Sequence, residues 1–408
     1  MKNIVDEARR LEDELLRHRR FIHENAELDM TLPMTSEYVR RQLETLGYSP
    51  QSCGESGIVA TAGKRGTGKV ILLRADMDAL PVAEETDLPF RSLNGRAHAC
   101  GHDLHTAMLL GAAQLLKMHE DELGGIVKLM FQPGEETAHG APAMIEAGVL
   151  ENPHVDAAMM IHVFSGIPIK AGTFILPDSE WVAAACDTFD IEIQGKGGHG
   201  AMPSFAIDPL NIAVHTHLAL QTINSREISA GDPMALTIGY IRGGSAPNVI
   251  PDKANLGGSV RTFAPKTRDF VQHRLEDIAT GQAHCLRGEA RVSYRRGAPA
   301  FHNDLGLARD LRAAMTGMFG PASVLDELAG GPLMGSEDFA FVSEKTPSVM
   351  VALAAGEPKD GYVYGQHHPK IRFDESVLPL GAACYAGCAI SWLRAPGKAA
   401  PVAPAAKS

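Results

Sequence analysis

Few cysteines, a deficit of positive charge and the lack of a long apolar run set the first limits on this protein. Its six cysteines include no CxxC pair, which argues against a disulfide framework or a zinc ribbon and favours a reducing compartment. Lys and Arg number 38 against 49 Asp and Glu, a net charge of −11, so we expect no binding to nucleic acid or membrane surfaces. Without an apolar run of about 18 residues or a signal-peptide core, we expect a cytoplasmic protein.

Helix and strand patterns divide the chain into two domains. Its 408 residues are too many for one ordinary core. Between residues 70 and 161 apolar strands alternate with helices, which predicts an α/β fold with a mixed, largely parallel central sheet. Between 183 and 300 the pattern becomes two helices and four strands of alternating polarity, typical of an α+β unit. We therefore expect a discontinuous domain, 1–182 and 301–408, with 183–300 inserted into it.

Possible metal ligands follow the first predicted strand. The run His98-Ala-Cys-Gly-His-Asp-Leu-His105 lies in a loop after the strand at 70–75 and just before a helix. Loops at the carboxyl ends of parallel strands are where α/β sheets place their sites. Cys100 and His102, with a glycine between them, can converge on one metal ion, and a thiolate can also bridge two ions.

Three further groups follow predicted strands or lie in a late loop. Glu135 and Glu136 come after the strand at 126–131, and one of the two could bind a metal while its neighbour faces a bound water as general base. His162 directly follows the strand at 155–161. The run Gln366-His-His-Pro369 offers one more histidine. Together these groups supply Cys, His, Glu, His and His, a set suited to two borderline-to-hard divalent ions.

In these runs the sequence resembles the M20 family of dinuclear metallopeptidases. It is most similar to the amidohydrolase branch, which includes hippurate hydrolases, auxin-conjugate hydrolases and N-acyl-amino-acid hydrolases. The resemblance implies a metallo-exopeptidase-like catalytic domain, 1–182 with 301–408, and an inserted lid or dimerisation domain, 183–300. The matching motifs span nearly the whole chain and are residues 73–81, 98–105, 131–136, 197–200, 248–251, 334–339 and 367–369.

The resemblance implies two divalent metal ions per chain. Cys100 matches the branch's metal-bridging cysteine, and further ligands match His102, Glu136 and His162. The last ligand in the family is a histidine two residues before a proline, which selects His367 over its neighbour. Zn²⁺ or Mn²⁺ are the expected ions, with Ni²⁺ and Co²⁺ also compatible, and a cysteine ligand leans toward zinc.

Other residues take roles in catalysis and substrate binding by the same resemblance. Glu135 matches the general base. His199 matches a histidine that stabilises the oxyanion, usually in the active site of the partner subunit, so a homodimer through the inserted domain is implied. Asn248 and Arg261 match residues that hold the substrate carboxylate, and Asp78 matches an aspartate that supports the metal site from behind.

The implied reaction is hydrolysis of the amide bond of an N-acyl amino acid, giving a carboxylic acid and a free amino acid. A dipeptidase or a deacetylase of N-acetyl-diamino acids would use the same metals with a different acyl pocket. A non-catalytic relative that only binds metal or carboxylate is a third hypothesis, which the intact set of Glu135, His199 and five ligands disfavours. The acyl group, the amino acid and the roles of His139, His368 and Glu337 stay open.

Overall fold

The computed structural model describes residues 2–64, 68–327 and 331–395. These form two compact units, which we name by their main sheets. The eight-stranded unit comprises Met1–Asp178, Asp304–Leu328 and Lys345–Ser408. The four-stranded unit comprises Ser179–Asn303 and Ala329–Glu344. The second unit therefore takes in 329–344 as well as 183–300, because backbone hydrogen bonds join Leu333 to Val182 and to Ala184.

The eight-stranded unit is built on one mixed sheet with a parallel centre. Strand β3 (Val70–Asp76) pairs in parallel with β4 (Ile126–Gln132) and with β5 (Ala157–Phe164), and β5 pairs in parallel with β16 (Ser348–Ala354). Antiparallel pairs continue the sheet on both sides, β4 with β2 (Ile58–Ala62) and β16 with β6 (Phe174–Ile175). Every residue of β3, β4 and β16 is buried, as expected for strands covered on both faces. The order across the sheet is β1 (Gln51–Ser52), β2 (Ile58–Ala62), β4 (Ile126–Gln132), β3 (Val70–Asp76), β5 (Ala157–Phe164), β16 (Ser348–Ala354), β6 (Phe174–Ile175) and β15 (Val324–Leu325).

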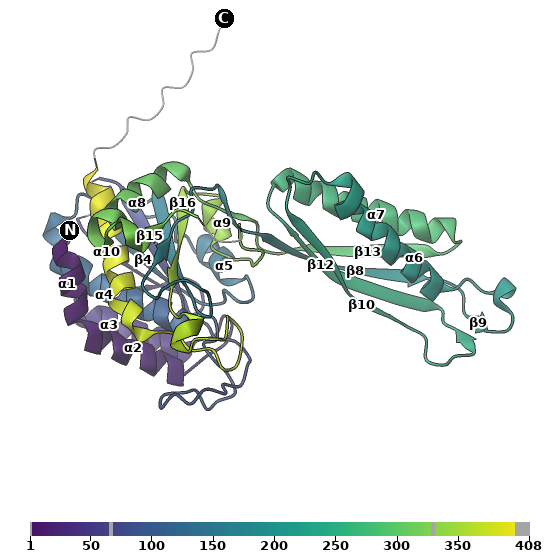
Figure 1. Cartoon of the computed structure of the whole chain (residues 1–408), viewed down its shortest axis with the longest axis horizontal. Coiled ribbons are helices and arrows are strands. Elements are labelled where there is room, and N and C mark those ends of the chain that lie inside the picture. The colour runs from purple at the N-terminus through teal and green to yellow at the C-terminus, as the bar shows by residue number, and fades with distance from the viewer. Residues whose placement is uncertain (1, 65–67, 328–330, 396–408) are drawn as a thin grey trace, which may run out of the picture. The chain divides into compact units, whose positions relative to one another are not determined.

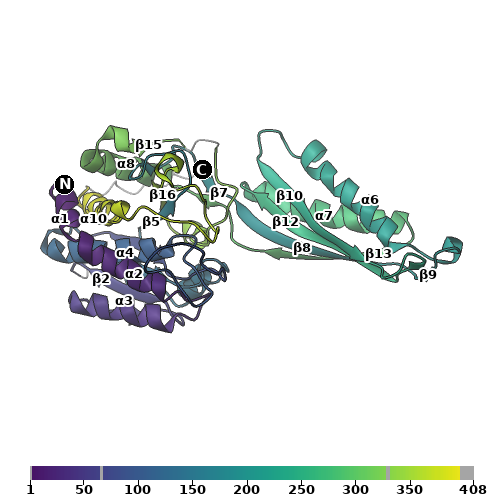
Figure 2. The same cartoon turned by 60° about the horizontal axis from the view of Figure 1, so that its bottom comes forward.

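Helices α4 (His102–Met118) and α10 (Leu378–Arg394) lie side by side against one face of this sheet (Figures 1 and 2). Alternate strand residues, such as Ile71 and Leu73 of β3, point to that face and join both helices in one apolar core. The remaining helices of the unit are α1 (Lys2–Arg10), α2 (Glu12–Glu24), α3 (Pro33–Thr45), α5 (Gly140–Glu146) and α8 (Leu305–Phe319).

One segment of this unit has the length and apolar composition of a membrane span. It covers Glu375–Arg394, which includes α10, whereas the sequence led us to expect no such segment. In the structure this segment is mostly buried, because α10 packs between α4, α1 and α8. A core helix of a globular domain has the same composition, so the segment is weak evidence for a membrane.

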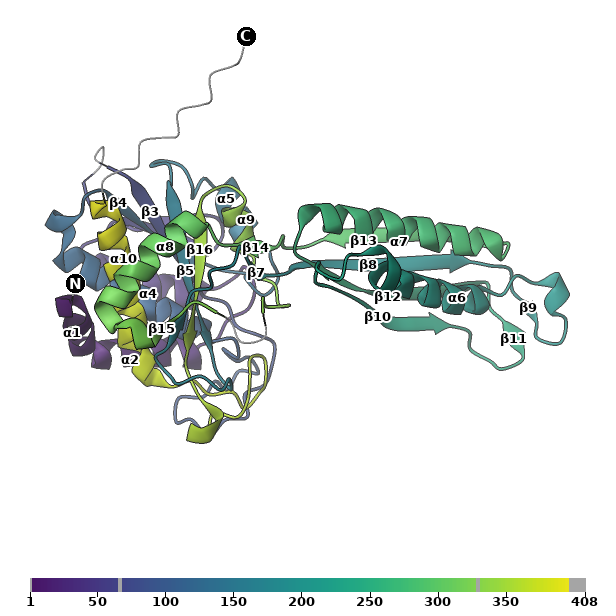
Figure 3. The same cartoon turned by 45° about the horizontal axis from the view of Figure 1, so that its top comes forward.

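The four-stranded unit is an antiparallel sheet with two helices on one face. The strand order is β10 (Met234–Gly243), β12 (Lys253–Thr262), β8 (Ala185–Gln194) and β13 (Glu289–Arg296). Alternate residues of β8, including Phe189 and Ile191, pack against α6 (Pro209–Thr222) and α7 (Pro265–Cys285), which run along the sheet (Figure 3). The predicted two helices and four strands are thus present. Shorter elements are β7 (Trp181–Ala183), β9 (Gly198–His199), β11 (Val249–Ile250), β14 (Phe301–His302) and α9 (Ala340–Ser343).

Candidate metal centre

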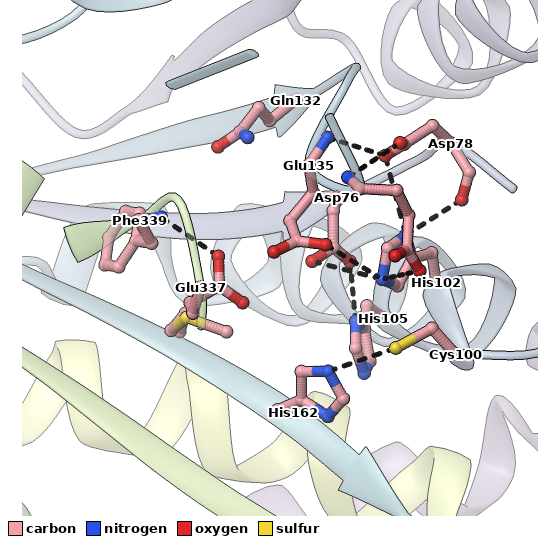
Figure 4. A network of polar contacts seen from close by, with 12 residues as sticks. Asp76, Asp78, Cys100, His102, His105, Gln132, Glu135, His162, Glu337 and Phe339 are labelled. Carbon is pink, nitrogen blue, oxygen red and sulfur yellow. Dashed lines mark hydrogen bonds and ion pairs between the residues drawn. The ribbon is translucent and has the colours of Figure 1, made fainter. Parts of the chain in front are cut away.

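The carboxyl ends of β3, β4 and β5 bring the predicted metal ligands together. Five predicted ligands fall into groups whose donor atoms all lie within 4.8 Å of one another. Cys100, His102 and His162 form one such group, and Cys100, Glu136 and His367 form another. Figure 4 shows the Cys100, His102 and His162 side chains turned toward one another beside Glu135. The expected convergence of strand ends therefore produces a compact set of donor atoms.

The donor set fits a divalent cation. Among the described residues, Nε2 of His102 and Oε1 of Glu136 are buried without a hydrogen-bond partner, and they lie 3.9 Å apart. Nδ1 of His102 donates to the carbonyl of Asp78 at 2.8 Å, so Nε2 is the nitrogen left for an ion. Burial raises the pKa of the Cys100 thiol, so its thiolate needs a cation nearby. Each of these features is the kind that bound metal would satisfy.

A single carboxylate fixes the backbone of both glutamates. Oδ1 of Asp78 accepts a hydrogen bond from the backbone N–H of Glu135 at 3.0 Å, and Oδ2 accepts one from Glu136 at 3.1 Å. The turn that carries this pair begins at Gly134, whose φ of 64° favours glycine. The side chain of Glu135 is about 10% exposed, with an oxygen 3.8 Å from Nε2 of His102. Asp78 therefore acts on the metal centre indirectly, by holding the backbone that carries Glu135 and Glu136.

The late loop brings His367 to the centre and turns His368 elsewhere. The backbone N–H of His367 donates to the carbonyl of Ala99 at 2.8 Å, and its Nε2 lies 3.6 Å from Oε1 of Glu136. Its φ of 68° is unusual for a residue other than glycine, and such strain clusters at functional sites. The ring of His368 instead stacks on Tyr364 with ring centres 4.1 Å apart. The geometry therefore separates two histidines that are adjacent in sequence.

Three predicted site residues lie in the four-stranded unit. His199 is exposed on β9, where it pairs with Val249 of β11. The carbonyl of Asn248 accepts from the backbone N–H of Gly200 at 2.8 Å, so the His199 and Asn248 segments are neighbours. Arg261 is half-buried on β12, opposite residues of β8 and β10.

Two further residues were left open by the sequence. Glu337, in the same unit, accepts at Oε1 a hydrogen bond from the backbone N–H of Phe339 at 2.9 Å (Figure 4). His139 is exposed directly before α5 and makes no side-chain capping bond there.

Sequence reasoning gave no role to two buried charged residues next to the donor set, Arg74 and Asp76. Asp76, the last residue of β3, is fully buried, and its Oδ1 accepts from Nδ1 of His105 at 2.6 Å. Its Oδ2 accepts from Nη1 of Arg74 at 2.5 Å. The signal that could have revealed them is an arginine and an aspartate inside the otherwise apolar strand 70–76, since buried charges need partners.

Comparison with known proteins places the chain in a family. Residues 72–391 match the model of Peptidase family M20/M25/M40. The chain is 37% identical over 394 residues to IAA-amino acid hydrolase ILR1-like 2 of Arabidopsis thaliana, covering 94% of this chain and 86% of the relative. It is 35% identical over 382 residues to N-acetylcysteine deacetylase of Bacillus subtilis, covering 92% and 96%.

A solved structure of the same family matches most of the chain. The YXEP protein of Bacillus subtilis, described as a dinuclear metal binding peptidase from the M20 family, matches with a TM-score of 0.80 at 32% identity, over 94% of this chain and 99% of that one. The chain belongs to peptidase family M20/M25/M40. It is a metal-dependent hydrolase with the two-part fold of that family.

Proposed function

We propose that this enzyme uses two divalent metal ions to hydrolyse the amide bond of N-acyl amino acids. The observation that carries the proposal is the group formed by His102, Glu135 and Glu136, in which a non-ligand carboxylate lies within 4.8 Å of two donor atoms. The names of the two relatives support the substrate class, since one is a hydrolase of amino acid conjugates and the other a deacetylase of an N-acetyl amino acid. An amide bond next to an amino acid is common to both.

The ions would be held by Cys100, His102, Glu136, His162 and His367. When bound, they would supply Lewis acidity and lower the pKa of water toward about 7. The buried thiol of Cys100 favours zinc over manganese among the candidate ions, because a soft sulfur ligand prefers it. A free thiol at this position also suits a reducing compartment, so the cytoplasm is the proposed location.

Glu135 would move the proton in this reaction. Its carboxylate would accept a proton from the attacking water and return it to the leaving nitrogen. Asp78 fixes the backbone on which Glu135 stands, so the carboxylate reaches the same place in each cycle. Adjacent Glu136, with its N–H held by the other oxygen of Asp78, would remain a ligand throughout.

His199 would stabilise the developing oxyanion. Nδ1 of His199 accepts a hydrogen bond from the backbone N–H of Ala201 at 3.1 Å, so a neutral ring carries its proton on Nε2. That proton is available for donation, and an oxyanion donor is worth roughly 3–4 kcal/mol in comparable sites. Arg261 would pair with the substrate carboxylate, and Asn248 would add a hydrogen bond to it.

The four-stranded unit would also form a homodimer. Several large apolar side chains of this unit are exposed, and contiguous exposed apolar surface marks interaction sites. A second copy of the chain is the proposed partner, in accord with the role of His199 at the neighbouring subunit's site. The exposed side chains are Met202 (58%), Phe205 (75%), Val214 (50%), Leu218 (59%) and Val249 (51%).

The test is hydrolysis of N-acetyl-L-cysteine and of N-benzoylglycine by protein loaded with Zn²⁺ or Mn²⁺. Glu135→Gln should bind about two ions per chain like the wild type and lose 10²–10⁴-fold in kcat. His139→Gln is the matched control: it changes an exposed side chain four residues away and should leave kcat unchanged. Metal-loaded wild type that hydrolyses no N-acyl amino acid, or full activity in Glu135→Gln, would contradict the proposal.

A further inference from the structure

Strands β3 and β5 separate where the donor atoms gather. Their parallel register runs from Ile71 opposite Ala157 to Arg74 opposite Met160, and the described residues give no later pair between them. Both strands nevertheless continue, β3 to Asp76 alongside β4, and β5 alongside β16. Two adjacent strands of one sheet thus lose their mutual backbone hydrogen bonds at the carboxyl end, where a ligand site can open.

Two helix side chains bridge this gap in place of the missing ladder. The hydroxyl of Tyr385, from α10, donates to the carbonyl of Arg74 at 2.6 Å and accepts from the N–H of Ile161 at 2.8 Å. Two residues further along each strand, the ring of His105 from α4 forms hydrogen bonds with Asp76 of β3 and with Val163 of β5. The first bridge lies in the apolar core, and the second lies against the donor set.

The hydrogen bonds of His105 fix its protonation. The backbone N–H of Val163 donates to Nε2 of His105 at 2.9 Å, so that nitrogen carries no proton. The proton is therefore on Nδ1, which donates it to Oδ1 of Asp76 at 2.6 Å. Asp76 is held in turn by Arg74 on its other oxygen. Only one orientation of the imidazole ring allows Nδ1 to reach Asp76 while Nε2 accepts from Val163.

The backbone of Val163, whose N–H is held by His105, also orients a predicted ligand through its carbonyl. The carbonyl of Val163 accepts from Nδ1 of His162 at 2.8 Å, which leaves Nε2 of that ring facing Sγ of Cys100 at 3.6 Å. The same carbonyl accepts from Nε2 of Gln366 at 2.8 Å. Gln366 directly precedes His367 in the chain. The backbone of Val163 therefore connects His105 directly with His162, and with His367 through its chain neighbour Gln366.

We propose that His105, oriented by Asp76, is a positioning residue that sets the backbone of Val163 and through it the metal-binding geometry of His162 and His367. The inference rests on the proposed function, because it assigns these two histidines to metal. His105 itself would touch neither ion, since both of its ring nitrogens are already engaged. Its effect would be on the affinity for metal and on the coordination geometry.

The experiment measures Co²⁺ binding by chelator competition, with the visible absorption bands of bound Co²⁺ as a second readout. His105→Leu removes both hydrogen bonds and should weaken the binding of at least one ion by about 10–100-fold, with altered bands. His105→Gln should partly restore affinity, because its amide offers one donor and one acceptor at a similar spacing. Should His105→Leu fail to fold, Gln366→Leu is the alternative variant, because Gln366 is less buried. It removes the hydrogen bond to the carbonyl of Val163 and should also weaken Co²⁺ binding.

Tyr385→Phe is the matched control, because it removes the other bridge between β3 and β5. It should lower the melting temperature while leaving Co²⁺ affinity within about threefold of the wild type. Equal losses of affinity in Tyr385→Phe and His105→Leu would overturn the inference, as would folded His105→Leu with wild-type affinity and bands. Wild-type protein that binds no Co²⁺ would instead contradict the proposed function itself, and this inference with it.

Discussion

Asp78 accepts the backbone N–H of Glu135 at 3.0 Å, so an aspartate beyond the end of β3 fixes the residue after β4 that we propose as general base. The two strands are parallel neighbours in the sheet, and their loops would otherwise move independently. This hydrogen bond and the second one, from the N–H of Glu136 to Asp78, tie the two loops together on one side of the site.

Asp78→Asn should therefore lower kcat by about 10–100-fold without unfolding the protein. An amide has one acceptor oxygen, and its NH₂ group would face one of the two backbone N–H donors. The matched control is Asp29→Asn, since Asp29 accepts an exposed hydrogen bond from Thr137 on the same loop. The control should stay within about twofold of the wild-type kcat in steady-state assays, and a similar loss in both variants would count against the assigned role.

Gly101→Ala should destabilise the protein and impair metal binding. Gly101 separates Cys100 from His102 with φ at 92°, and an added Cβ would lie 2.4 Å from Cγ2 of Val163. Gly148 has a similar φ of 87° with nothing near its Cβ position, so Gly148→Ala measures the backbone strain alone. That strain is about 1–2 kcal/mol, and crowding at Gly101 should add a further 1–3 kcal/mol. Urea denaturation and metal analysis of both variants check this expectation, which equal losses would refute.

Asp187→Ala should cost about 3–5 kcal/mol of the stability of the four-stranded unit. Buried Asp187 accepts from Nε and Nη2 of Arg268 at 2.9 and 2.5 Å and from the Tyr294 hydroxyl at 2.8 Å. Its removal leaves a guanidinium that is only 11% exposed without its charge partner. The control is Asp269→Ala, which breaks an exposed pair with Arg296 and should cost less than about 1 kcal/mol. Denaturation curves for both variants should show this difference, and equal costs would contradict it.

His23 should make stability depend on pH in the alkaline range. Burial alone lowers the pKa of His23, but hydrogen bonds to Asp103 and Glu84 outweigh burial and the charge of Arg19, and raise this pKa to about 9. A pKa above the unfolded value of about 6.5 means that the stabilisation is complete below pH 6.5 and is lost as the pH rises through 9.

The size of this effect is on the order of 3 kcal/mol, from about 1.4 kcal/mol per pH unit of pKa difference. The measurement compares the free energy of unfolding of wild type and His23→Gln between pH 6 and pH 10. The advantage of the wild type should shrink across that range. An advantage that grows with pH would show that the protonated ring is not the stabilising form.

The sequence predicted the convergence of Cys100, Glu136 and His162 because strand ends in a parallel sheet meet at one edge whatever the side chains between them. It could not predict the bridge through His105, because the second partner of that ring is a backbone N–H of another strand. The place of segment 329–344 in the four-stranded unit also depended on long-range backbone bonds, to Val182 and Ala184, which leave no local pattern.

The choice between His367 and His368 came from resemblance alone. Residue type and periodicity are the same for two adjacent histidines, so nothing local distinguishes them. The left-handed backbone at His367 and its hydrogen bond to Ala99 decide which ring meets Glu136. Both features depend on how a late loop docks against an early one, and they become visible in the folded chain.

The strained loop that carries His367 has a consequence for biosynthesis. Four of the five proposed ligands lie between Cys100 and His162, and the fifth, His367, follows 205 residues after His162 (367 − 162). At a translation rate of about 5–20 residues per second, the ribosome delivers it roughly 10–40 s after the fourth. The four-stranded unit is made in that interval. A nascent chain therefore carries four of the proposed donors before the fifth exists, so the full proposed set can assemble only after the four-stranded unit has been made.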